Sequence, residues 1–465
     1  MNQTTRRSTC GTAVILGLAR QGKALARFYA ERGTRVIVSD SRSAEVLQPA
    51  MADLADLGLE YVLGGHPLRL LDGCAVLCPS GGVPLDLPIV QEAISRGIRL
   101  SNDAQEFLAR CPAPTVGITG SAGKTTTTTL VGKMLDASGF VTRVGGNIGN
   151  PLINDLAEIA PTDRVVMELS SFQLELVTAS PHIAGVLNIT PNHLDRHRTM
   201  DVYIAAKRNI VAHQTGVDVA VLGYDEPNAR ALAAATPAEL RYFSGETEVA
   251  VGAFLQGKRL MLRRDGDEVA VVERGDVRLR GFHNVMNVLA AIALADATGA
   301  TLEGMRRAIA AFTGVPHRLE PVRQLRGASW INDSIATAPE RVLAALDSFD
   351  EPLVLLAGGR DKDLPWERLA ARVVERVRLL VLFGEAAPLI GEHVATARTA
   401  ARSSGEPGVL ECVVMVGTLQ SAVEAAAKRV LPGDVVLLSP GGTSFDAFRD
   451  FAERGMRFRE WVNQL

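Results

Sequence analysis

A glycine-rich segment that ends in Gly123-Lys124-Thr125 holds the residue types that bind nucleotide phosphates. It follows an apolar β-branched run at residues 115–118 and precedes a helix-forming segment, so backbone N–H groups at the helix N-terminus can surround phosphate oxygens. In such a loop the Lys124 amine meets the β- and γ-phosphates and the Thr125 hydroxyl faces Mg2+. The usual loop has a Gly where this chain has Ile118, so the match is to a shorter form, residues 120–125. We predict phosphate binding here and not an ordinary Gly-rich turn.

Five consecutive threonines, residues 125–129, open the helix expected after this loop. β-branched side chains lose rotamer freedom in a helix, so the run is a poor helix former. We therefore expect these hydroxyls to have hydrogen-bond partners.

Further residues that could bind a metal follow downstream. Glu168 ends an apolar run, a position where parallel-sheet enzymes place metal ligands, although a strand-end carboxylate can also be unremarkable. Residues 192–197 offer His193, Asp195 and His197 at alternating positions. The sequence leaves open whether this second cluster is a metal site or a hydrogen-bonded loop.

Lys207 is informative because of its place in a predicted helix, residues 201–213. Tyr203, Ile210 and Val211 lie on its face, which predicts that Lys207 points inward. A buried amine has a lowered pKa and is partly neutral, so it can be nucleophilic or accept a covalent modification. The alternative is a lysine whose amine reaches solvent from a partly apolar face.

The elements that must position these residues predict an α/β fold. Short apolar runs alternate with helical segments almost throughout the 465 residues, as in βα units on parallel sheets. Such a length accommodates roughly two to four domains. We predict three: a Rossmann-like N-terminal domain at 1–111, a P-loop-type central ATPase domain at 112–314 and a Rossmann-like C-terminal domain at 315–465. The first boundary lies in Cys111-Pro112-Ala113-Pro114 and the second in the turn-rich linker 313–318.

The expected elements can be stated by residue range. The first domain has predicted strands at 13–16, 35–39, 60–63 and 75–77 and helices at 22–32, 44–57 and 88–96. The central domain begins with a strand at Val116, continues through strands at 164–167, 183–187 and 219–222, carries an antiparallel addition at 246–280, and ends with a helix at 285–297. The third domain has predicted strands at 353–357, 379–383, 412–416 and 435–438.

Composition excludes several classes of protein. Lys plus Arg is 49 and Asp plus Glu is 52, and the resulting net charge of −3 offers no electrostatic footprint for nucleic acid or an anionic membrane. The apolar run at 13–19 is interpreted as a strand and not an export signal, and no run approaches the ~20 apolar residues of a membrane span. The five Cys are scattered without zinc-site spacing, so packed, reduced thiols and a cytoplasmic location are expected.

Together these residues resemble the Mur ligase family, ATP-dependent amide-forming enzymes that build the peptide of bacterial cell-wall precursors. The resemblance spans essentially the whole chain and is strongest to members that join D-glutamate to UDP-N-acetylmuramoyl-L-alanine. Nine motifs in family order carry it: 118–125, 145–149, 168–175, 193–196, 205–207, 283–287, 317–320, 332–334 and 438–440.

The resemblance implies two cofactors, ATP and Mg2+, and the residues that bind them. The implied catalytic residues are Lys124, Glu168, His193 and Lys207, and the implied Mg2+ ligands are Thr125, Glu168, His193 and a carbamylated Lys207. ATP is expected to contact Gly120, Ser121, Ala122, Gly123, Lys124, Thr125, Thr126, Asn284, Asn287, Arg318 and Asp333.

The resemblance also implies substrate contacts. Arg20, Gln21, Asp40, Arg42 and Ser80 correspond to the UDP-sugar pocket, Asn147, Ser170 and Gln173 to positions that contact substrate or phosphate, and Thr337, Lys362, Ser444 and Phe451 to the glutamate pocket. Taken without the resemblance, residues 17–22 are a degraded dinucleotide fingerprint, with Ala19 for the middle Gly and Asp40 23 residues after Gly17. That pattern suggests a dehydrogenase domain, but the phosphate loop and the other motifs explain more.

Three departures from the family pattern are visible. Ala122 stands where the family loop has Asn, and Ile335 stands where well-known members have a Lys that helps hold the amino-acid carboxylate. Gly441-Gly442-Thr443 also replaces a more common Ala-Cys-Ala type of sequence. Two of the three departures fall in the expected glutamate pocket.

The implied reaction forms an acyl phosphate from the L-alanyl carboxylate and ATP, and the glutamate amine then displaces phosphate. A sister ligase for another amino acid, such as L-glutamate, would share every ATP motif. A folate-type polyglutamate ligase would share the central domain but not the N-terminal one, and a non-catalytic nucleotide-binding regulator would keep the loop without releasing phosphate. The expected protein is a monomer with small-molecule substrates and without nucleic-acid or membrane partners.

Overall fold

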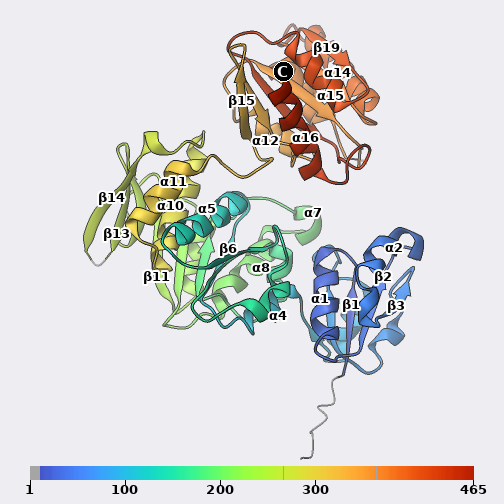
Figure 1. Cartoon of the computed structure of the whole chain (residues 1–465), viewed down its shortest axis with the longest axis vertical. Coiled ribbons are helices and arrows are strands. Elements are labelled where there is room, and N and C mark those ends of the chain that lie inside the picture. Colours follow the sequence, from blue (N-terminus) through green and yellow to red (C-terminus); the bar gives the residue numbers. More distant parts are fainter. Residues whose placement is uncertain (1–10, 265, 363) are drawn as a thin grey trace, which may run out of the picture. The chain divides into compact units, whose positions relative to one another are not determined.

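The computed structural model describes residues 11–264, 266–362 and 364–465. Three sheets with helices packed on them confirm the α/β class (Figure 1). The chain forms two compact units, one of residues up to Arg278 with Phe282–Phe312 and the other of Leu279–Gly281 with Thr313–Leu465. The first unit contains two of the sheets, and the three-domain boundaries drawn from the sequence remain predictions.

The first sheet has five parallel strands in the order β3-β2-β1-β4-β5. Its central strand is fully buried, as expected for an apolar run with helices on both faces. The strand order reverses between β1 and β4, and ligands of open α/β sheets bind beyond the strand ends at such a point. Its elements are β1 (Thr12–Leu16), α1 (Arg20–Ala30), β2 (Val36–Asp40), α2 (Ala44–Ala52), β3 (Glu60–Leu63), β4 (Cys74–Pro79), α3 (Pro88–Ser95), β5 (Arg99–Leu100) and α4 (Asp103–Leu108).

The second sheet has nine strands in the order β14-β13-β12-β11-β10-β9-β6-β8-β7. The strands from β7 to β12 are parallel, and β12, β13 and β14 form the antiparallel addition predicted for 246–280. The strands are β6 (Thr115–Thr119), β7 (Thr142–Gly146), β8 (Arg164–Glu168), β9 (Ile183–Val186), β10 (Val219–Gly223), β11 (Glu239–Ser244), β12 (Gly252–Gln256), β13 (Arg259–Arg264) and β14 (Asp267–Glu273). The helices are α5 (Lys124–Ala137), α6 (Ser171–Leu174), α7 (Leu194–His197), α8 (Met200–Ala212), α9 (Pro227–Ala231), α10 (Phe282–Ala297) and α11 (Leu302–Ala311).

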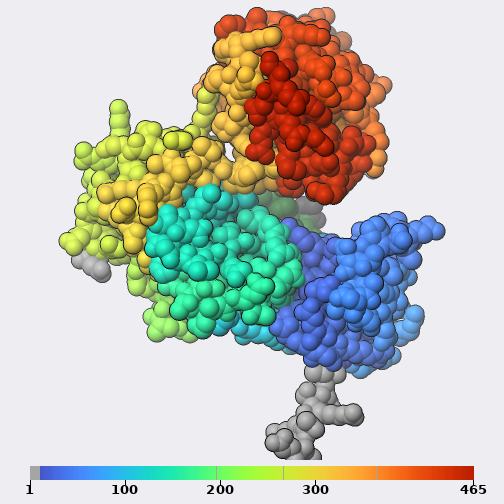
Figure 2. Space-filling view, viewed as in Figure 1, coloured from blue at the N-terminus to red at the C-terminus, as the bar shows by residue number. Residues whose placement is uncertain are grey.

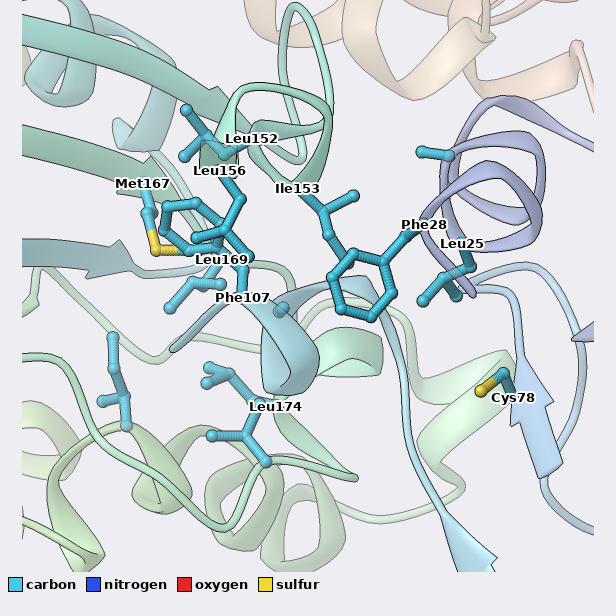
Figure 3. Packing of buried hydrophobic residues seen from close by; sticks show 14 of the residues in the cluster. Leu25, Phe28, Cys78, Phe107, Leu152, Ile153, Leu156, Met167, Leu169 and Leu174 are labelled. Atoms are coloured by element: carbon cyan, nitrogen blue, oxygen red, sulfur yellow. The ribbon is translucent and has the colours of Figure 1, made fainter. Parts of the chain in front are cut away.

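One hydrophobic cluster runs through both sheets of the first unit. Figure 3 shows Phe28 of α1 beside Ile153, which lies in the connection after β7, with Phe107 of α4 close by. In the space-filling view the blue surface of the first sheet also meets the green surface of the second (Figure 2). The two sheets therefore share a core.

The third sheet has six strands in the order β15-β16-β20-β17-β18-β19 and is parallel except for the β15–β16 hairpin. The sequence analysis missed this hairpin; Pro321 lies in its first strand, and β15 is at the sheet edge, where proline is tolerated. The elements are β15 (Glu320–Leu325), β16 (Ala328–Asn332), α12 (Pro339–Leu346), β17 (Leu353–Gly358), α13 (Glu367–Arg376), β18 (Val377–Phe383), α14 (Ala387–Ser403), β19 (Cys412–Met415), α15 (Leu419–Ala427), β20 (Val435–Gly441) and α16 (Phe451–Gln464).

Two expectations from composition can be compared with the structure. In the part of the chain that is described, no helix combines the length and apolar character of a membrane span. Cys74, Cys78, Cys111 and Cys412 are not in disulfides, but Cys412 is exposed, so the expectation of packed thiols is wrong there. Cys10 lies outside the described residues.

Candidate active site

The predicted phosphate loop connects β6 to α5. Gly123 has a φ of +83°, a left-handed conformation that favours glycine, and a Cβ at this position would overlap the Asn287 side chain. Asn287 donates a hydrogen bond to Asn284 Oδ1 at 3.0 Å. The structure therefore brings two predicted ATP contacts of α10 to the loop. All of the predicted loop residues lie between the end of β6 and the first turn of α5: Gly120, Ser121, Ala122, Gly123, Lys124, Thr125 and Thr126.

Two side chains hold the loop in this conformation. Asn188 Oδ1 accepts a hydrogen bond from the Ala122 N–H at 2.9 Å, and the Asn188 amide donates to the Ala122 carbonyl at 3.2 Å. The Ser121 hydroxyl donates to the Thr190 carbonyl at 2.8 Å. Sequence reasoning missed Asn188, although its place directly after the apolar run at 183–187 was a usable signal.

The amines of Lys124 and Lys207 converge on one carbonyl oxygen. Lys124 Nζ donates to the Gly120 carbonyl at 2.8 Å, and Lys207 Nζ donates to the same oxygen at 3.0 Å. Lys207 is 1% exposed, which confirms its predicted inward orientation. Burial, and secondly the nearby Lys124 charge, lower the pKa of Lys207 well below its ordinary value, against an opposing effect of Glu168. The position therefore favours a neutral amine.

Glu168 ends β8 as a buried carboxylate. Its Oε2 accepts from the Thr125 hydroxyl at 2.8 Å, and its Oε1 accepts from the Asn147 amide at 2.9 Å. The Asn147 N–H also donates to the Glu168 carbonyl at 2.9 Å. Three predicted site residues that are distant in sequence therefore meet here.

These oxygens fit Mg2+, which prefers oxygen ligands and combines one or two carboxylates with phosphates and waters. The Thr125 hydroxyl and the Glu168 carboxylate are such donors and lie within hydrogen-bond distance of each other. Among the residues that the structure describes, no group of three or more His, Cys, Asp or Glu side chains could hold a metal ion. A Mg2+ site would therefore need ligands from the nucleotide or from a modified Lys207.

The two histidines of residues 192–197 have different surroundings in the structure. His193 has a φ of +53°, precedes α7, and its ring lies 5.2 Å from the Phe172 ring. His197 is buried; its Nε2 lies 2.9 Å from Ser171 Oγ and its Nδ1 lies 3.2 Å from a carboxylate oxygen of Glu175. His197, the last residue of α7, is thus held by Ser171 and Glu175, and His193 remains the predicted metal ligand. The Asp195 side chain lies outside the described part of the chain.

The predicted UDP-sugar residues gather at the carboxyl ends of β1, β2 and β4. The Asp40 carboxylate accepts from the Leu18 N–H at 2.8 Å and from the Arg42 guanidinium at 2.8 and 3.0 Å. Burial alone would raise the pKa of Asp40, but these hydrogen bonds outweigh it and hold the pKa well below its usual range. The Ser80 hydroxyl donates to the Gly17 carbonyl at 2.9 Å. These residues lie at the switch point of the first sheet.

The remaining predicted contacts of the first unit lie at helix N-termini. Arg20 and Gln21 occupy the first turn of α1. Ser170 caps α6 in a capping box with Gln173, which is 1% exposed and donates to the Asp103 carboxylate at 3.2 Å. Burial raises the pKa of Asp103 to about 6. Because the Gln173 side chain is already committed to these partners, its contact with substrate remains a prediction.

In the second unit, Asp333 follows β16 and is buried close to Arg318. Its carboxylate accepts from the Ser439 hydroxyl at 2.8 Å and from the Leu319 N–H at 3.2 Å. Burial raises the pKa of Asp333 to about 7, against the lowering effects of these hydrogen bonds and of the charges on Arg318 and Arg341. This carboxyl therefore titrates near neutral pH.

Replacing Asp333 with Asn is expected to flatten the pH dependence of stability of the second unit. The pKa of about 7 in the folded state lies above the unfolded value of about 3.9, so the folded state binds more protons between these values and stability falls as pH rises through them. The parent loses roughly 4 kcal/mol of this contribution to the free energy of unfolding between pH 4 and pH 8, and the variant does not. Urea unfolding followed by tryptophan fluorescence measures it, because Trp330, Trp366 and Trp461 all lie in this unit.

The control for this prediction is Asp350→Asn, which removes an exposed carboxylate from the same unit. It should leave the pH dependence of unfolding as it is in the parent. Equal slopes for the Asp333→Asn variant and the parent would contradict the prediction.

The predicted glutamate residues also lie in the second unit. Lys362 Nζ donates to Thr337 Oγ1 at 3.5 Å, while Ser444 is buried and Phe451 begins α16. Burial, then the charges of Arg341 and Arg454, lower the pKa of Lys362. Several cations therefore lie near one another here, an environment that favours an anionic ligand.

Arg454 is a residue of this region that sequence reasoning missed. Its side chain is fully buried and donates to Ser334 Oγ at 3.0 Å, to the Ser334 carbonyl at 2.9 Å and to the Gly442 carbonyl at 3.1 Å. The Ser334 hydroxyl in turn donates to the Phe451 carbonyl at 2.8 Å. Burial lowers the pKa of Arg454 to about 10. The spacing of Phe451 and Arg454 at i and i+3 on one helix was the available signal.

The fold and this site define a nucleotide-binding α/β enzyme with a phosphate loop at the start of α5. Its sequence matches three family models: the Mur ligase MurD-like N-terminal domain at residues 11–102, the Mur ligase middle domain at 118–295 and the Mur ligase glutamate ligase domain at 317–442. The chain belongs to the Mur ligase family, whose members use ATP.

Curated relatives match along almost their full length. The UDP-N-acetylmuramoylalanine–D-glutamate ligase of Symbiobacterium thermophilum is 43% identical over 455 residues, covering 97% of this chain and 98% of the relative. The enzyme of the same name from Geotalea uraniireducens is 41% identical over 456 residues, with 97% of both chains covered.

Solved structures share the fold. UDP-N-acetylmuramate-alanine ligase MurC of Thermotoga maritima has a TM-score of 0.58 at 20% identity and covers 98% of this chain and 99% of its own. MurF of Acinetobacter baumannii has a TM-score of 0.57 at 18% identity, covering 96% and 93%. At such identities the likeness concerns the three-domain architecture alone.

Proposed function

We propose that the chain is an ATP-dependent ligase that adds D-glutamate to UDP-N-acetylmuramoyl-L-alanine during peptidoglycan precursor synthesis. The observation that carries the ligase chemistry is the meeting of Lys124, Thr125, Glu168 and Lys207 around one loop at the ends of parallel strands. The full-length relatives that bear this activity in their names support the substrate assignment.

The reaction needs two displacements. An oxygen of the L-alanyl carboxylate attacks the γ-phosphorus of ATP, the bond to ADP breaks, and an acyl phosphate forms. The glutamate amine then attacks the acyl carbon and loses a proton, and phosphate leaves as the amide forms. The protein positions the groups and offsets charge: Lys124 is assigned to the β- and γ-phosphates, and the backbone N–H groups in the first turn of α5 are assigned to the phosphate oxygens.

Mg2+ would be held by Thr125, Glu168, His193 and, once carbamylated, Lys207. Bound there, it would offset the negative charge of the phosphates. The chain's own contribution is the orientation of these oxygens, since the Asn147 amide and the Thr125 hydroxyl each hold one oxygen of Glu168.

The amino-acid pocket is proposed around Thr337, Lys362, Ser444 and Phe451. Arg454 and Arg341 add positive charge near Lys362, which supports a substrate with two carboxylates. Because position 335 is Ile, the buried Arg454 is the cation we assign to supporting this pocket. We further propose that the protein acts as a monomer in the cytoplasm, where ATP and nucleotide-linked precursors are present.

The proposal is tested by ATP-dependent phosphate release with UDP-N-acetylmuramoyl-L-alanine and a panel of amino acids that includes both glutamate enantiomers. Release with D-glutamate alone is expected. Release with L-glutamate or another amino acid would instead assign a sister ligase. ATP binding without any phosphate release would assign a non-catalytic nucleotide-binding protein.

A further inference from the structure

Arg20, at the start of α1, reaches from the first sheet to a loop of the second. Its Nη2 donates to the Asn147 carbonyl at 2.8 Å and its Nη1 donates to the Gly149 carbonyl at 2.6 Å. Hydrogen bonds from a charged donor are about twice as strong as neutral ones, and two of them from one planar group also fix direction. The loop at 145–150 is therefore tied to α1 at two points.

These hydrogen bonds matter because the glycines of the loop give its backbone wide conformational freedom. Gly146 and Gly149 have φ values of +98° and +58°, and glycine loses more conformational freedom on ordering than other residues. A Cβ at Gly146 would lie 2.5 Å from the Glu168 carbonyl oxygen, so the loop packs directly on the end of β8. Its position and that of Glu168 therefore depend on each other.

Asn147 carries the contact onward to the phosphate loop. Its N–H and its side-chain amide donate to the Glu168 carbonyl and to Glu168 Oε1, both at 2.9 Å. Glu168 Oε2 accepts from the Thr125 hydroxyl at 2.8 Å. An unbroken series of hydrogen bonds thus joins Arg20, Asn147, Glu168 and Thr125.

We propose that Arg20 is a positioning residue for the nucleotide site and couples it to the pocket of the first sheet. By holding the Asn147 and Gly149 carbonyls, it fixes the 145–150 loop and with it the Glu168 carboxylate. The two bonds use two of the five N–H groups of a guanidinium, which leaves donors for a ligand diphosphate at the switch point of the first sheet. An anion bound there immobilises Arg20 and thereby stabilises the nucleotide site; by linkage, nucleotide favours the anion equally.

The shared core of the two sheets supports this coupling. Phe28 lies on the same helix as Arg20, and Ile153 follows the 145–150 loop; both belong to the hydrophobic cluster of Figure 3. The helix and the loop that Arg20 connects are therefore each anchored in one packed core.

The experiment measures the affinity of the full-length chain for ATP in the presence of Mg2+ by calorimetry, without any UDP-sugar. Arg20→Met is expected to raise the Kd for ATP about 5- to 10-fold, and Arg20→Lys, which keeps the charge but not the two-point geometry, by less. Lys23→Met is the matched control, because Lys23 lies on the same helix but bonds Asp53 at the C-terminal end of α2 and not the 145–150 loop. It should bind ATP like the parent.

Two further measurements make the outcome decisive. Amide hydrogen exchange in residues 145–150 should be faster in Arg20→Met than in Lys23→Met. UDP-N-acetylmuramoyl-L-alanine should tighten ATP binding to the parent at least about 5-fold and much less to Arg20→Met. Unchanged ATP affinity and exchange in Arg20→Met, with a rise only in the KM for the UDP-sugar, would overturn the proposal. Of these measurements, only the effect of UDP-N-acetylmuramoyl-L-alanine on ATP affinity rests on the proposed function. A failure of the proposed function would show separately, in the phosphate-release assay with the panel of amino acids.

Discussion

Lys124→Ala is expected to lower ATP-dependent phosphate release by at least about 1,000-fold while leaving the fold intact. One removed charge-stabilising donor costs about 100- to 1,000-fold, and a cation on a transferring phosphoryl group costs as much or more. Lys124 bonds the carbonyls of Gly120 and Ser121, at 2.8 and 3.2 Å, so its amine already lies over the loop that receives the phosphates. The measurement is kcat for phosphate release with all substrates saturating.

Two features make this result specific to chemistry. Ala is a better helix former than Lys, so the first turn of α5 should persist and the far-ultraviolet circular dichroism and the unfolding midpoint should match those of the parent. Lys133→Ala is the matched control, since Lys133 is an exposed lysine of the same helix. Full activity in Lys124→Ala, or equal losses in both variants, would refute the assigned role.

Much of the fold could be predicted because its signals are local. The strand before the phosphate loop, the inward face of α8 around Lys207 and the antiparallel addition all follow from residue types over short windows. The loop itself was predictable for the same reason: Gly123 must adopt a left-handed conformation and Lys124 must follow it.

The parts that could not be predicted depend on contacts between distant segments. Asn188 supports the loop from 66 residues away, and Arg454 reaches Ser334 across 120 residues. The place of Asn188 after a strand and the spacing of Arg454 from Phe451 can mark these two residues as candidates, but no local signal indicates their partners. Helix 44–57 was also too long as predicted, because α2 ends at Ala52 and a short 3-10 turn, Ala55–Leu57, follows.

The threonine run at 125–129 also shows that local sequence does not indicate which hydroxyl groups find a hydrogen-bond partner. The Thr125 hydroxyl has the partner that its position suggested, the carboxylate of Glu168. The expectation is wrong for Thr127 and Thr128, whose buried hydroxyls have no hydrogen-bond partner within the described part of the chain. Propensity shows that the run is costly in a helix, but only the packing of α5 against the sheet decides which hydroxyls face an acceptor.

Lys207→Ala is expected to abolish phosphate release, and short carboxylates such as acetate or formate should restore part of it. The reason is carbamylation: the neutral amine nitrogen attacks the carbon of CO2, an N–C bond forms, one amine proton is lost, and the side chain ends in a carboxylate. Burial and the Lys124 charge lower the pKa of Lys207 well below its ordinary value, which favours the neutral, nucleophilic form of the amine. The new carboxylate would lie beside Thr119 and Gly120, which Lys207 Nζ contacts at 3.1 and 3.0 Å.

The modification can be measured without turnover. With 13C-labelled bicarbonate, the parent should show a carbamate carbon signal that is absent from Lys207→Ala but present in Lys133→Ala, which lacks only an exposed lysine. The rescue by added carboxylate and the uptake of label should agree. A carboxylate added in solution can replace the missing group only if that group was itself a carboxylate. A Lys207→Ala variant that acetate does not rescue, together with a parent that takes up no label, would assign the buried amine a purely structural role.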